Sequence, residues 1–262
     1  MTYISKNKQS FGIVAKDYKR YRGSYTSSLY EALFSLMLKK QDQVSILDLG
    51  CGVGNSTEPL LKTAKKFKIK TTIIGCDPDQ EMLKEARKSA KQNMLPVAYV
   101  QGSAEKLPFE KESFDVIISG AAFHWFATAK AMKEIQRVLR KNGMYFVFWT
   151  QNIKSNKPTI GDEIYKKYKF KGIPQKLRDP KFVKDLFLKA GFLKVKIMKI
   201  PYTEKKTLGE TIGLIKTNSG YAVLSSADKK KFIQEIEKEY KKALGNKQNL
   251  LQQEIHVCFG IK

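Results

Sequence analysis

The sequence has few cysteines, few arginines and no long hydrophobic run. Its 262 residues include only Cys51, Cys76 and Cys258, whose odd number and wide spacing match neither a disulfide framework nor a CxxC metal site. We therefore expect free thiols and no bound metal. No run approaches the roughly 20 apolar residues of a membrane span, and the first ten residues lack the apolar segment of a signal peptide. These absences predict a cytoplasmic protein with no membrane partner.

Positive charge is abundant, but almost all of it comes from lysine. The chain carries 49 Lys and Arg against 25 Asp and Glu, a net charge of +24, which ordinarily favours nucleic acid or another anionic partner. Only six of the 49 are Arg, and the lysines are scattered along the whole chain. Because arginine makes the bidentate phosphate contacts and scattered lysine mostly makes a solvated surface, nucleic acid stays open as a partner but is not favoured.

Short apolar runs alternate with amphipathic stretches from Val44 to about Tyr145. A helix predicted over 127–143 ends at Gly143, a residue suited to the C′ position. The other predicted elements are helices over 55–67 and 79–93 and strands over 44–49, 71–76, 97–100, 113–119 and 144–150. This order predicts an α/β fold with a doubly wound, mostly parallel sheet and helices on both faces.

The pattern changes after Thr150. Residues 151–176 are polar and lysine-rich, which predicts loops and short helices over the rim of the sheet. Three more helices are predicted over 180–192, 207–217 and 227–244, and two more strands over 194–200 and 254–261. No low-complexity linker separates these segments from the first half, so we expect one domain over residues 1–262.

The strongest local signal is a glycine-rich turn, DLGCGVG at residues 48–54, between the first predicted strand and helix. Glycines allow a tight turn and the close approach of a ligand, while the following helix offers free N–H groups. The spacing GxGxG is not the dinucleotide fingerprint, because Asn55 stands where the third glycine would be. Asp77, at the end of the second strand, could accept hydrogen bonds from a ribose. The pattern predicts a nucleoside ligand, with a plain βα turn as the alternative.

Four segments resemble, in order, the motifs of class I S-adenosylmethionine-dependent methyltransferases: LDLGCGVG, IIGCDPDQEML, GSAEKLPFEKESFDVIIS and EIQRVLRKNGMYFVF, within residues 44–149. The resemblance implies S-adenosyl-L-methionine as cofactor, S-adenosyl-L-homocysteine as product, and a seven-stranded sheet whose final strand is antiparallel at an edge. It also implies a cofactor site made of Asp48, Gly50, Cys51, Gly52 and Gly54 around the methionine, Asp77 at the ribose, Pro78 and Met82 flanking the adenine, Ser103, Ala104 and Glu105 at its edge, and Ser119.

Other segments are similar to the trans-aconitate methyltransferase-like group. They are Phe11, Ala15, Tyr18, Arg22 and Tyr25 in an N-terminal pattern, AAFHWF at 121–126, IGLIKTNSGYAVL at 212–224 and the ending IHVCFGIK. The resemblance implies a helical lid over 1–40, a cofactor-binding core over 41–150, and a substrate cap with completing strands over 151–262. Tyr18 and Arg22 would close over the cofactor's carboxylate, unless they simply belong to a solvated helix.

The acceptor side of the site is predicted from fewer residues. His124 follows the fourth predicted strand, where ligands of doubly wound sheets bind. It could orient or deprotonate an acceptor. Alternatively it makes a structural hydrogen bond while Trp125 forms part of the pocket wall. Tyr202 and Tyr221 fall in the half that should cover the acceptor, although helix packing explains Tyr221 as well. A carboxylate is already ionised near pH 7 and needs no base. We expect a monomer that methylates a small molecule, at a carboxylic acid oxygen.

The charge keeps an RNA methyltransferase as the alternative. Two absences oppose it: SGAAFHW stands where amino-group methylases of nucleic acid resemble one another in an Asn/Asp-Pro-Pro-Tyr turn, and no cysteine nucleophile lies nearer than Cys76. The chain also shows no added OB, KH or zinc module. A non-catalytic cofactor-binding protein is a third interpretation, which the intact glycine turn and Asp77 oppose.

Overall fold

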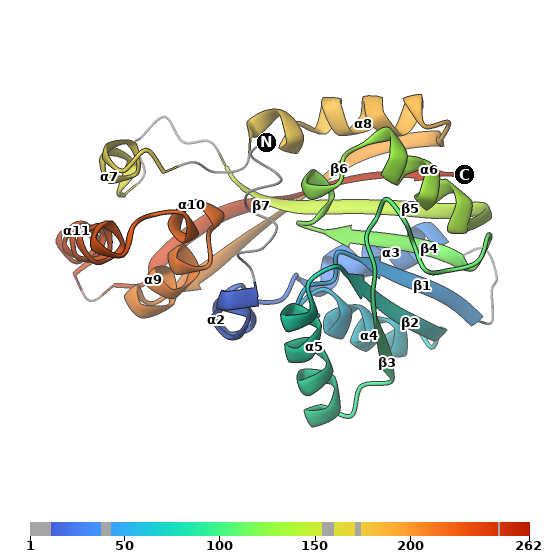
Figure 1. Cartoon of the computed structure of the whole chain (residues 1–262), viewed down its shortest axis with the longest axis horizontal. Helices are drawn as coiled ribbons and strands as arrows, with labels where there is room; N and C mark the ends of the chain where they lie inside the picture. Colours follow the sequence, from blue (N-terminus) through green and yellow to red (C-terminus); the bar gives the residue numbers. More distant parts are fainter. Residues whose placement is uncertain (1–11, 38–42, 154–159, 171–173, 246) are drawn as a thin grey trace.

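The computed structural model describes residues 12–37, 43–153, 160–170, 174–245 and 247–262 (Figure 1). Phe11 and the rest of the first eleven residues, which belong to the predicted lid, lie outside this part. The strands are β1 (Gln43–Leu49), β2 (Lys70–Asp77), β3 (Val97–Gln101), β4 (Phe114–Gly120), β5 (Leu139–Asn152), β6 (Leu193–Lys206) and β7 (Asn249–Ile261). They form one sheet in the order β3-β2-β1-β4-β5-β7-β6. The predicted fold class, a mostly parallel seven-stranded sheet, is confirmed.

The last strand is antiparallel but does not lie at an edge, so that expectation is wrong. β7 pairs antiparallel with β5 on one side and with β6 on the other, which leaves β6 as the edge strand. The physical reason lies in the side chains of β7, where Val257 and Cys258 point to opposite faces and both are fully buried. On β6, by contrast, Leu193 and Ile197 are exposed, as an edge strand allows.

Helices cover both faces of the sheet and one end of it (Figure 1). They are α2 (Ala15–Tyr21), α3 (Ser27–Met37), α4 (Thr57–Lys66), α5 (Gln80–Gln92), α6 (Ala129–Val138), α7 (Asp162–Lys167), α8 (Pro180–Lys189), α9 (Leu208–Lys216), α10 (Ser219–Ala222) and α11 (Ser226–Leu244), with short 3-10 turns η1 (Gly12–Val14), η2 (Phe123–Trp125) and η3 (Gln175–Arg178). No helix within the described ranges is both long and apolar enough to cross a membrane.

The core has a separate layer on each face because neighbouring side chains of a strand point to opposite sides. On one face α3 and α4 pack against side chains such as Ile46 and Phe146. On the other face α6 and α8 pack against Leu47 and Tyr145. A third cluster joins α7, α9 and α11 around Phe232. We call α7, α9, α10 and α11 the cap helices, and Figure 1 shows them beyond the carboxyl ends of the parallel strands.

The boundary between α6 and β5 differs from the prediction. The helix ends at Val138 and the strand begins at Leu139, so Gly143 lies within β5 and is not a helix C′ residue. Leu139 pairs with Phe114 of β4, and the Arg140 guanidinium contacts the Asp115 carboxylate at 2.8 Å. These tertiary contacts override the helical pattern of the segment.

Strands β6 and β7 are also longer than predicted. The predicted ranges 194–200 and 254–261 extend to Lys206 in β6 and back to Asn249 in β7, and the added polar residues pair with one another. A ladder can hold such polar segments because its hydrogen bonds use the backbone only. The extension carries both strands past the edge of the core toward the cap helices.

Candidate active site

A cavity of about 610 Å³ opens at the carboxyl ends of the parallel strands. Its wall includes the glycine turn after β1, the end of β2, part of α2, and the ends of β5, β6 and β7. From β1 the chain continues to β2 and β3 on one side, and the later strands β4 and β5 lie on the other side. Doubly wound sheets leave a crevice for a ligand at this switch in strand order.

The glycine turn forms the floor of the cavity and needs glycine at Gly50. This residue has φ +75°, and a Cβ built on it would collide with the Cβ of Ala122. The N–H groups of Gly50 and Cys51 donate to the carbonyl of Cys76 at 2.7 and 3.2 Å, which fixes the turn against the end of β2. Gly50, Cys51 and Gly52 line the cavity, whereas Gly54 lies beneath it.

Asp48 supports the turn from below and does not line the cavity. Its Oδ2 accepts hydrogen bonds from the Ser56 and Thr57 hydroxyls at 2.6 and 2.7 Å, and its Oδ1 has no partner among the described residues. Burial raises the pKa of Asp48 to about 6, although the two hydroxyl donors oppose the shift. The carboxylate therefore ties the start of α4 to the end of β1.

Asp77 lies at the cavity surface with both carboxylate oxygens already oriented. The N–H of Gly52 donates to its Oδ2 and the N–H of Asp79 to its Oδ1, each at 2.9 Å. Burial raises the pKa of Asp77 to about 6, while these two donors lower it. Each carboxylate oxygen has a second lone pair to offer a ligand, so a hydroxyl-bearing ligand has acceptors here.

The remaining predicted residues of this end line one part of the cavity, which we call the cofactor slot. Pro78, Met82, Ser103, Ala104 and Glu105 all line the cavity. Met82 packs with Ala15 and Val53, and Asp79 caps the first turn of α5 by accepting from the N–H groups of Glu81 and Met82. The cap residue fixes the direction of α5 and with it the position of the slot.

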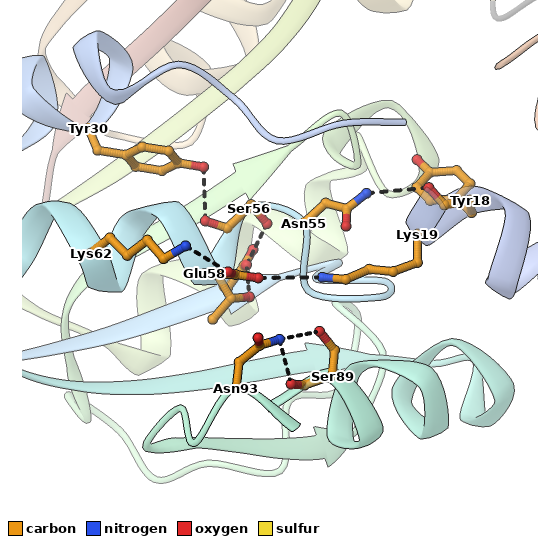
Figure 2. Close-up of polar contacts among 11 residues, drawn as sticks. Tyr18, Lys19, Tyr30, Asn55, Ser56, Glu58, Lys62, Ser89 and Asn93 are labelled. Atoms are coloured by element: carbon orange, nitrogen blue, oxygen red, sulfur yellow. Dashed lines mark hydrogen bonds and ion pairs between the residues drawn. The ribbon is translucent and has the colours of Figure 1, made fainter. Parts of the chain in front are cut away.

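Helix α2 closes one side of the cavity and is bonded at two places. Tyr18 and Arg22 both line the cavity. Figure 2 shows Asn55, at the glycine turn, donating from Nδ2 to the Tyr18 carbonyl at 3.4 Å, and Lys19 facing Glu58 of α4 at 3.9 Å. These contacts hold α2 over the glycine turn.

The second attachment of α2 is to the cap helices through Arg22. Its Nε donates to the Thr217 hydroxyl at 3.0 Å, and its Nη2 lies 3.3 Å from both the Thr217 carbonyl and the Asn218 Oδ1. The guanidinium also lies over the Tyr18 ring, 5.0 Å from its centroid. We call this set, Arg22 with Thr217 and Asn218, the roof joint.

The predicted acceptor residues are divided between the cavity and the core. Trp125 and Tyr202 line the cavity, whereas His124 and Tyr221 do not. His124 is buried in η2 with its Nε2 unpartnered among the described residues, and burial, aided by the charges of Arg178 and Arg22, lowers its pKa to about 3. Tyr221 packs its ring against Phe232 in the cap core, 6.0 Å between centroids. Ser119 is likewise buried, with its hydroxyl 3.2 Å from that of Tyr145.

Sequence reasoning missed most of the wall opposite the cofactor slot. We call it the distal wall, and it consists of Tyr25, Trp125, Thr150, Arg178, Tyr202, Glu204, Lys206 and Gln253. A single signal pointed to it, because Arg178 is the only arginine after Arg140 in a lysine-rich half of the chain. Tyr25 lies between α2 and α3 and Trp125 lies in η2, while the remaining residues enter through the extended ends of β5, β6 and β7, which polar sequence alone does not predict.

Polar contacts fix most of the distal wall. The Tyr202 hydroxyl donates to Gln253 Oε1 at 2.6 Å, and Lys206, only 7% exposed, contacts Glu204 at 2.7 Å. Arg178 donates from Nη2 to the Thr150 carbonyl at 2.9 Å. The distal wall therefore carries one ion pair, Lys206 with Glu204, and the further positive charge of Arg178.

Comparison with known proteins identifies the family. A family model described as a methyltransferase domain matches residues 47–147. An uncharacterized methyltransferase-like protein of Schizosaccharomyces pombe is 30% identical over 257 residues, which cover 96% of this chain and 92% of the relative. This chain belongs to the class I S-adenosylmethionine-dependent methyltransferases.

One further relative and one solved structure are similar to the methyltransferase. A provisionally named methyltransferase of Dictyostelium discoideum is 28% identical over 243 residues, covering 91% of this chain and 88% of the relative. The crystal structure of phosphoethanolamine N-methyltransferase 2 of Haemonchus contortus, with phosphomonomethylethanolamine and S-adenosylhomocysteine, is similar with a TM-score of 0.58. The identity is 16%, and the match covers 99% of this chain and 59% of that one, so this likeness concerns the fold.

The methyltransferase uses S-adenosyl-L-methionine, and the cavity fits this cofactor. The glycine turn brings the backbone of Gly50, Cys51 and Gly52 to the cavity surface. Asp77 keeps carboxylate lone pairs available at the end of β2. The slot at Pro78, Met82 and Ala104 offers apolar side chains to a flat ring. A backbone surface for the methionine part, a carboxylate for the ribose and apolar side chains for the adenine therefore lie in one wall.

Proposed function

We propose that this methyltransferase transfers the methyl group to a carboxylate oxygen of a small organic acid. The observation that carries the proposal is the distal wall, where Arg178 supplies a positive charge beside the ion pair of Lys206 with Glu204. Bound S-adenosyl-L-methionine supplies an electrophilic methyl carbon, which an acceptor oxygen must meet in line. The excess positive charge of this wall attracts an acceptor that is already an anion.

Among the described residues the site offers no well-placed general base, which also favours a carboxylate acceptor. The imidazole of His124 lies outside the cavity wall, and its pKa of about 3 makes it a weak base. Glu204, the carboxylate of the distal wall, is paired with Lys206. An amine or phenol acceptor needs a proton removed, whereas a carboxylate is ionised near pH 7 without help.

We assign the cofactor contacts on the same basis. The backbone of the glycine turn (Gly50 to Gly52) would lie against the methionine part, and Asp77 would accept from the ribose hydroxyls. The adenine would lie between Pro78 and Met82, with Ser103, Ala104 and Glu105 at its edge. Tyr18 and Arg22 would cover the cofactor's carboxylate, since the roof joint uses Nε and Nη2 of Arg22 and both residues line the cavity.

We also propose that the chain is a relative of the trans-aconitate methyltransferase-like group, with a lid over 1–40, a core over 41–150 and a cap over 151–262. The AAFHWF segment supports the proposal because it forms η2 and brings Trp125 to the cavity. The segment 212–224 supports it because it contributes Leu214 and Asn218 to the wall. RNA is not favoured as the acceptor, since the cations of the distal wall lie inside a cavity.

The test is methyl transfer from labelled cofactor into a cell extract, with small solutes, protein and RNA counted separately. We expect the label among the small solutes and its release by mild base, because methyl esters hydrolyse under conditions that leave N-methyl groups intact. An Asp77→Asn variant serves as the control that the label depends on the cofactor site. Label that resists base, or that appears in RNA, would overturn the proposal.

A further inference from the structure

Thr217 and Asn218 of the roof joint belong to the cap, yet they hold an arginine of the cavity wall. Arg22 is the C-cap residue of α2, and it lines the cavity together with Asn218. Thr217, the C-cap residue of α9, is only 1% exposed and does not line the cavity. The joint therefore connects a buried residue of the cap to a cation at the cavity surface.

The acceptors in the joint are themselves held in place. The Thr217 hydroxyl donates to the Leu214 carbonyl at 2.7 Å, so its oxygen receives Nε of Arg22 at 3.0 Å through a lone pair. Asn218 is the N-cap residue of α10, and its carbonyl accepts from the N–H of Ala222 at 3.1 Å. A free arginine side chain has a large rotamer entropy, and here the partners that restrict it are already fixed by the cap.

The joint orients the guanidinium of Arg22 without neutralising it. Nε and Nη2 donate to the hydroxyl and carbonyl of Thr217 and to Asn218 Oδ1, and all three acceptors are uncharged oxygens. The guanidinium is planar, so Nη1 lies on the side away from the edge that the cap holds. The guanidinium also lies over the Tyr18 ring. A cation that is fixed at a cavity surface by neutral partners suits an anionic ligand group.

We propose that Thr217 and Asn218 are positioning residues of the cofactor site, which orient the guanidinium of Arg22 toward the carboxylate of the cofactor's methionine part. The inference rests on the proposed assignment of Arg22 to that carboxylate and deepens it. A carboxylate gains most from an arginine that is already oriented, because binding then costs little further side-chain entropy. The affinity for the cofactor thus depends on the cap as well as on the glycine turn.

The experiment compares two ligands that differ only in the carboxylate. S-adenosylhomocysteine and its decarboxylated analogue, S-adenosyl-3-thiopropylamine, are titrated by calorimetry into the wild type, Thr217→Val, Arg22→Leu and the double variant. Thr217→Val keeps the shape of the side chain and removes the hydroxyl that accepts from Arg22. Thr211→Val is the matched control, because Thr211 is buried in α9 but its hydroxyl has no partner within the described ranges.

We expect Thr217→Val to weaken the binding of S-adenosylhomocysteine by roughly 10-fold, since a hydrogen bond to a charged group is lost. Binding of the decarboxylated analogue should change little, and Thr211→Val should bind both ligands like the wild type. The double variant should bind S-adenosylhomocysteine no more weakly than Arg22→Leu, because Thr217 acts through Arg22. An equal loss on both ligands would show a merely structural joint and overturn the proposal, as would no loss on either.

Asn218→Asp tests the same point without loosening the joint. Aspartate keeps the shape of asparagine, and its carboxylate would pair with Arg22 where Oδ1 now lies 3.3 Å from Nη2. Affinity for S-adenosylhomocysteine should fall by roughly 10-fold, because the charge of Arg22 then has an anion within the protein. The decarboxylated analogue should bind at least as well as before. Unfolding in denaturant shows that each variant is folded, and full affinity of Asn218→Asp for S-adenosylhomocysteine would contradict the proposal.

These outcomes separate this inference from the proposed function. A selective loss in Arg22→Leu without one in Thr217→Val would leave Arg22 at the cofactor's carboxylate and sink the role of the cap. The absence of a selective loss in Arg22→Leu would overturn both of these assignments. Base-labile label among the small solutes of the extract reports carboxyl methylation independently, because neither titrated ligand contains an acceptor or a methyl group to transfer.

Discussion

At the scale of single residues, burial sets the proton affinity of Asp77. Its pKa of about 6 lies above the ordinary value near 4 for this group. The folded state therefore binds more protons than the unfolded state between about pH 4 and about pH 6, and the free energy of unfolding falls as the pH rises through that window. Above about pH 6 the residue contributes no further change. Cofactor binding should move the opposite way, because ribose hydroxyls bond to the ionised form.

We expect the affinity for S-adenosylhomocysteine to rise with pH up to about 6 and then to level off. At about pH 5 the dissociation constant should be roughly tenfold larger than at about pH 7.5, because one pH unit below the pKa only about a tenth of the carboxyl groups are ionised. Calorimetric titration at each pH measures it. Asp77→Asn should bind weakly and without this pH dependence, and a variant that kept the full dependence would contradict the assignment.

His124 leads to a prediction about the rate. Because burial lowers its pKa to about 3, the residue stays neutral over the whole range in which the enzyme is stable. The pH profile of kcat should show no step near 6.5, and His124→Asn should lower kcat by less than about tenfold. Loss of a working general base would cost roughly 100- to 10,000-fold. Steady-state kinetics of the wild type and His124→Asn against pH distinguish a structural role of His124 from a role as general base.

The sequence predicted residues at this scale unevenly. Asp77 could be assigned because strand ends and a glycine turn place it by local pattern. Arg178 could not, because its position depends on how η3 meets the end of β5, two segments 28 residues apart. Tyr221 was placed near the acceptor, yet its ring packs on Phe232. The sequence around a helical tyrosine does not indicate which neighbouring element its ring will contact.

At the scale of elements, the contact between α2 and α9 can be tested with two glycines of one helix. A Cβ on Gly213 would overlap the ring of Tyr21 in α2, whereas a Cβ on Gly209 would meet nothing within 4 Å. Gly213→Ala should lower the free energy of unfolding by about 1–3 kcal/mol and weaken cofactor binding, because α2 also covers the cofactor end. Gly209→Ala should raise it by about 0.5–1 kcal/mol. Chemical denaturation of both variants measures the difference.

If Gly213→Ala left both stability and cofactor affinity unchanged, α2 and α9 would not be packed as described. The matched glycine makes that outcome informative, since both substitutions add the same methyl group to the same helix. Gly213 is buried against Tyr21, whereas Gly209 is exposed in the first turn of α9.

Elements with strong local patterns were predicted well. The strand predicted over 97–100 is observed as Val97–Gln101, and the helix predicted over 79–93 as Gln80–Gln92. The failure at Val138 and Leu139 has a tertiary cause, the pairing with β4 and the contact of Arg140 with Asp115. A sequence window contains the lysines and arginines of that segment but not the strand that pairs with it.

At the scale of the whole molecule, the net charge of +24 should act on stability. Like charges repel most in the compact state, and salt screens them over about 8–10 Å at physiological ionic strength. We expect Tm to rise by roughly 2–4 °C, equivalent to about 1 kcal/mol, between about 10 mM and about 200 mM NaCl. Differential scanning calorimetry checks this, and a falling Tm would show that local ion pairs outweigh the repulsion.

The open edge of the sheet carries part of this charge. Lys194, Lys196 and Lys199 are exposed along β6, and Pro201 lacks the N–H that a further strand would need. The order of strands and helices was enough to predict the sheet as a whole. The order along the chain did not reveal that β7 would lie between β5 and β6 in the sheet. The pairing of the two strand ends depends on which segments meet in space.

The roof joint limits how this enzyme can be redesigned. Five of the eight distal-wall residues follow residue 150, so grafting the 151–262 segment of a homologue onto the core would exchange most of that wall. Arg22, the C-cap residue of α2, bonds across this boundary to Thr217 and Asn218. A chimera with its crossover at residue 150 would separate these partners. Recombination should therefore succeed only when the grafted segment supplies Arg22 with equivalent acceptors at positions 217 and 218.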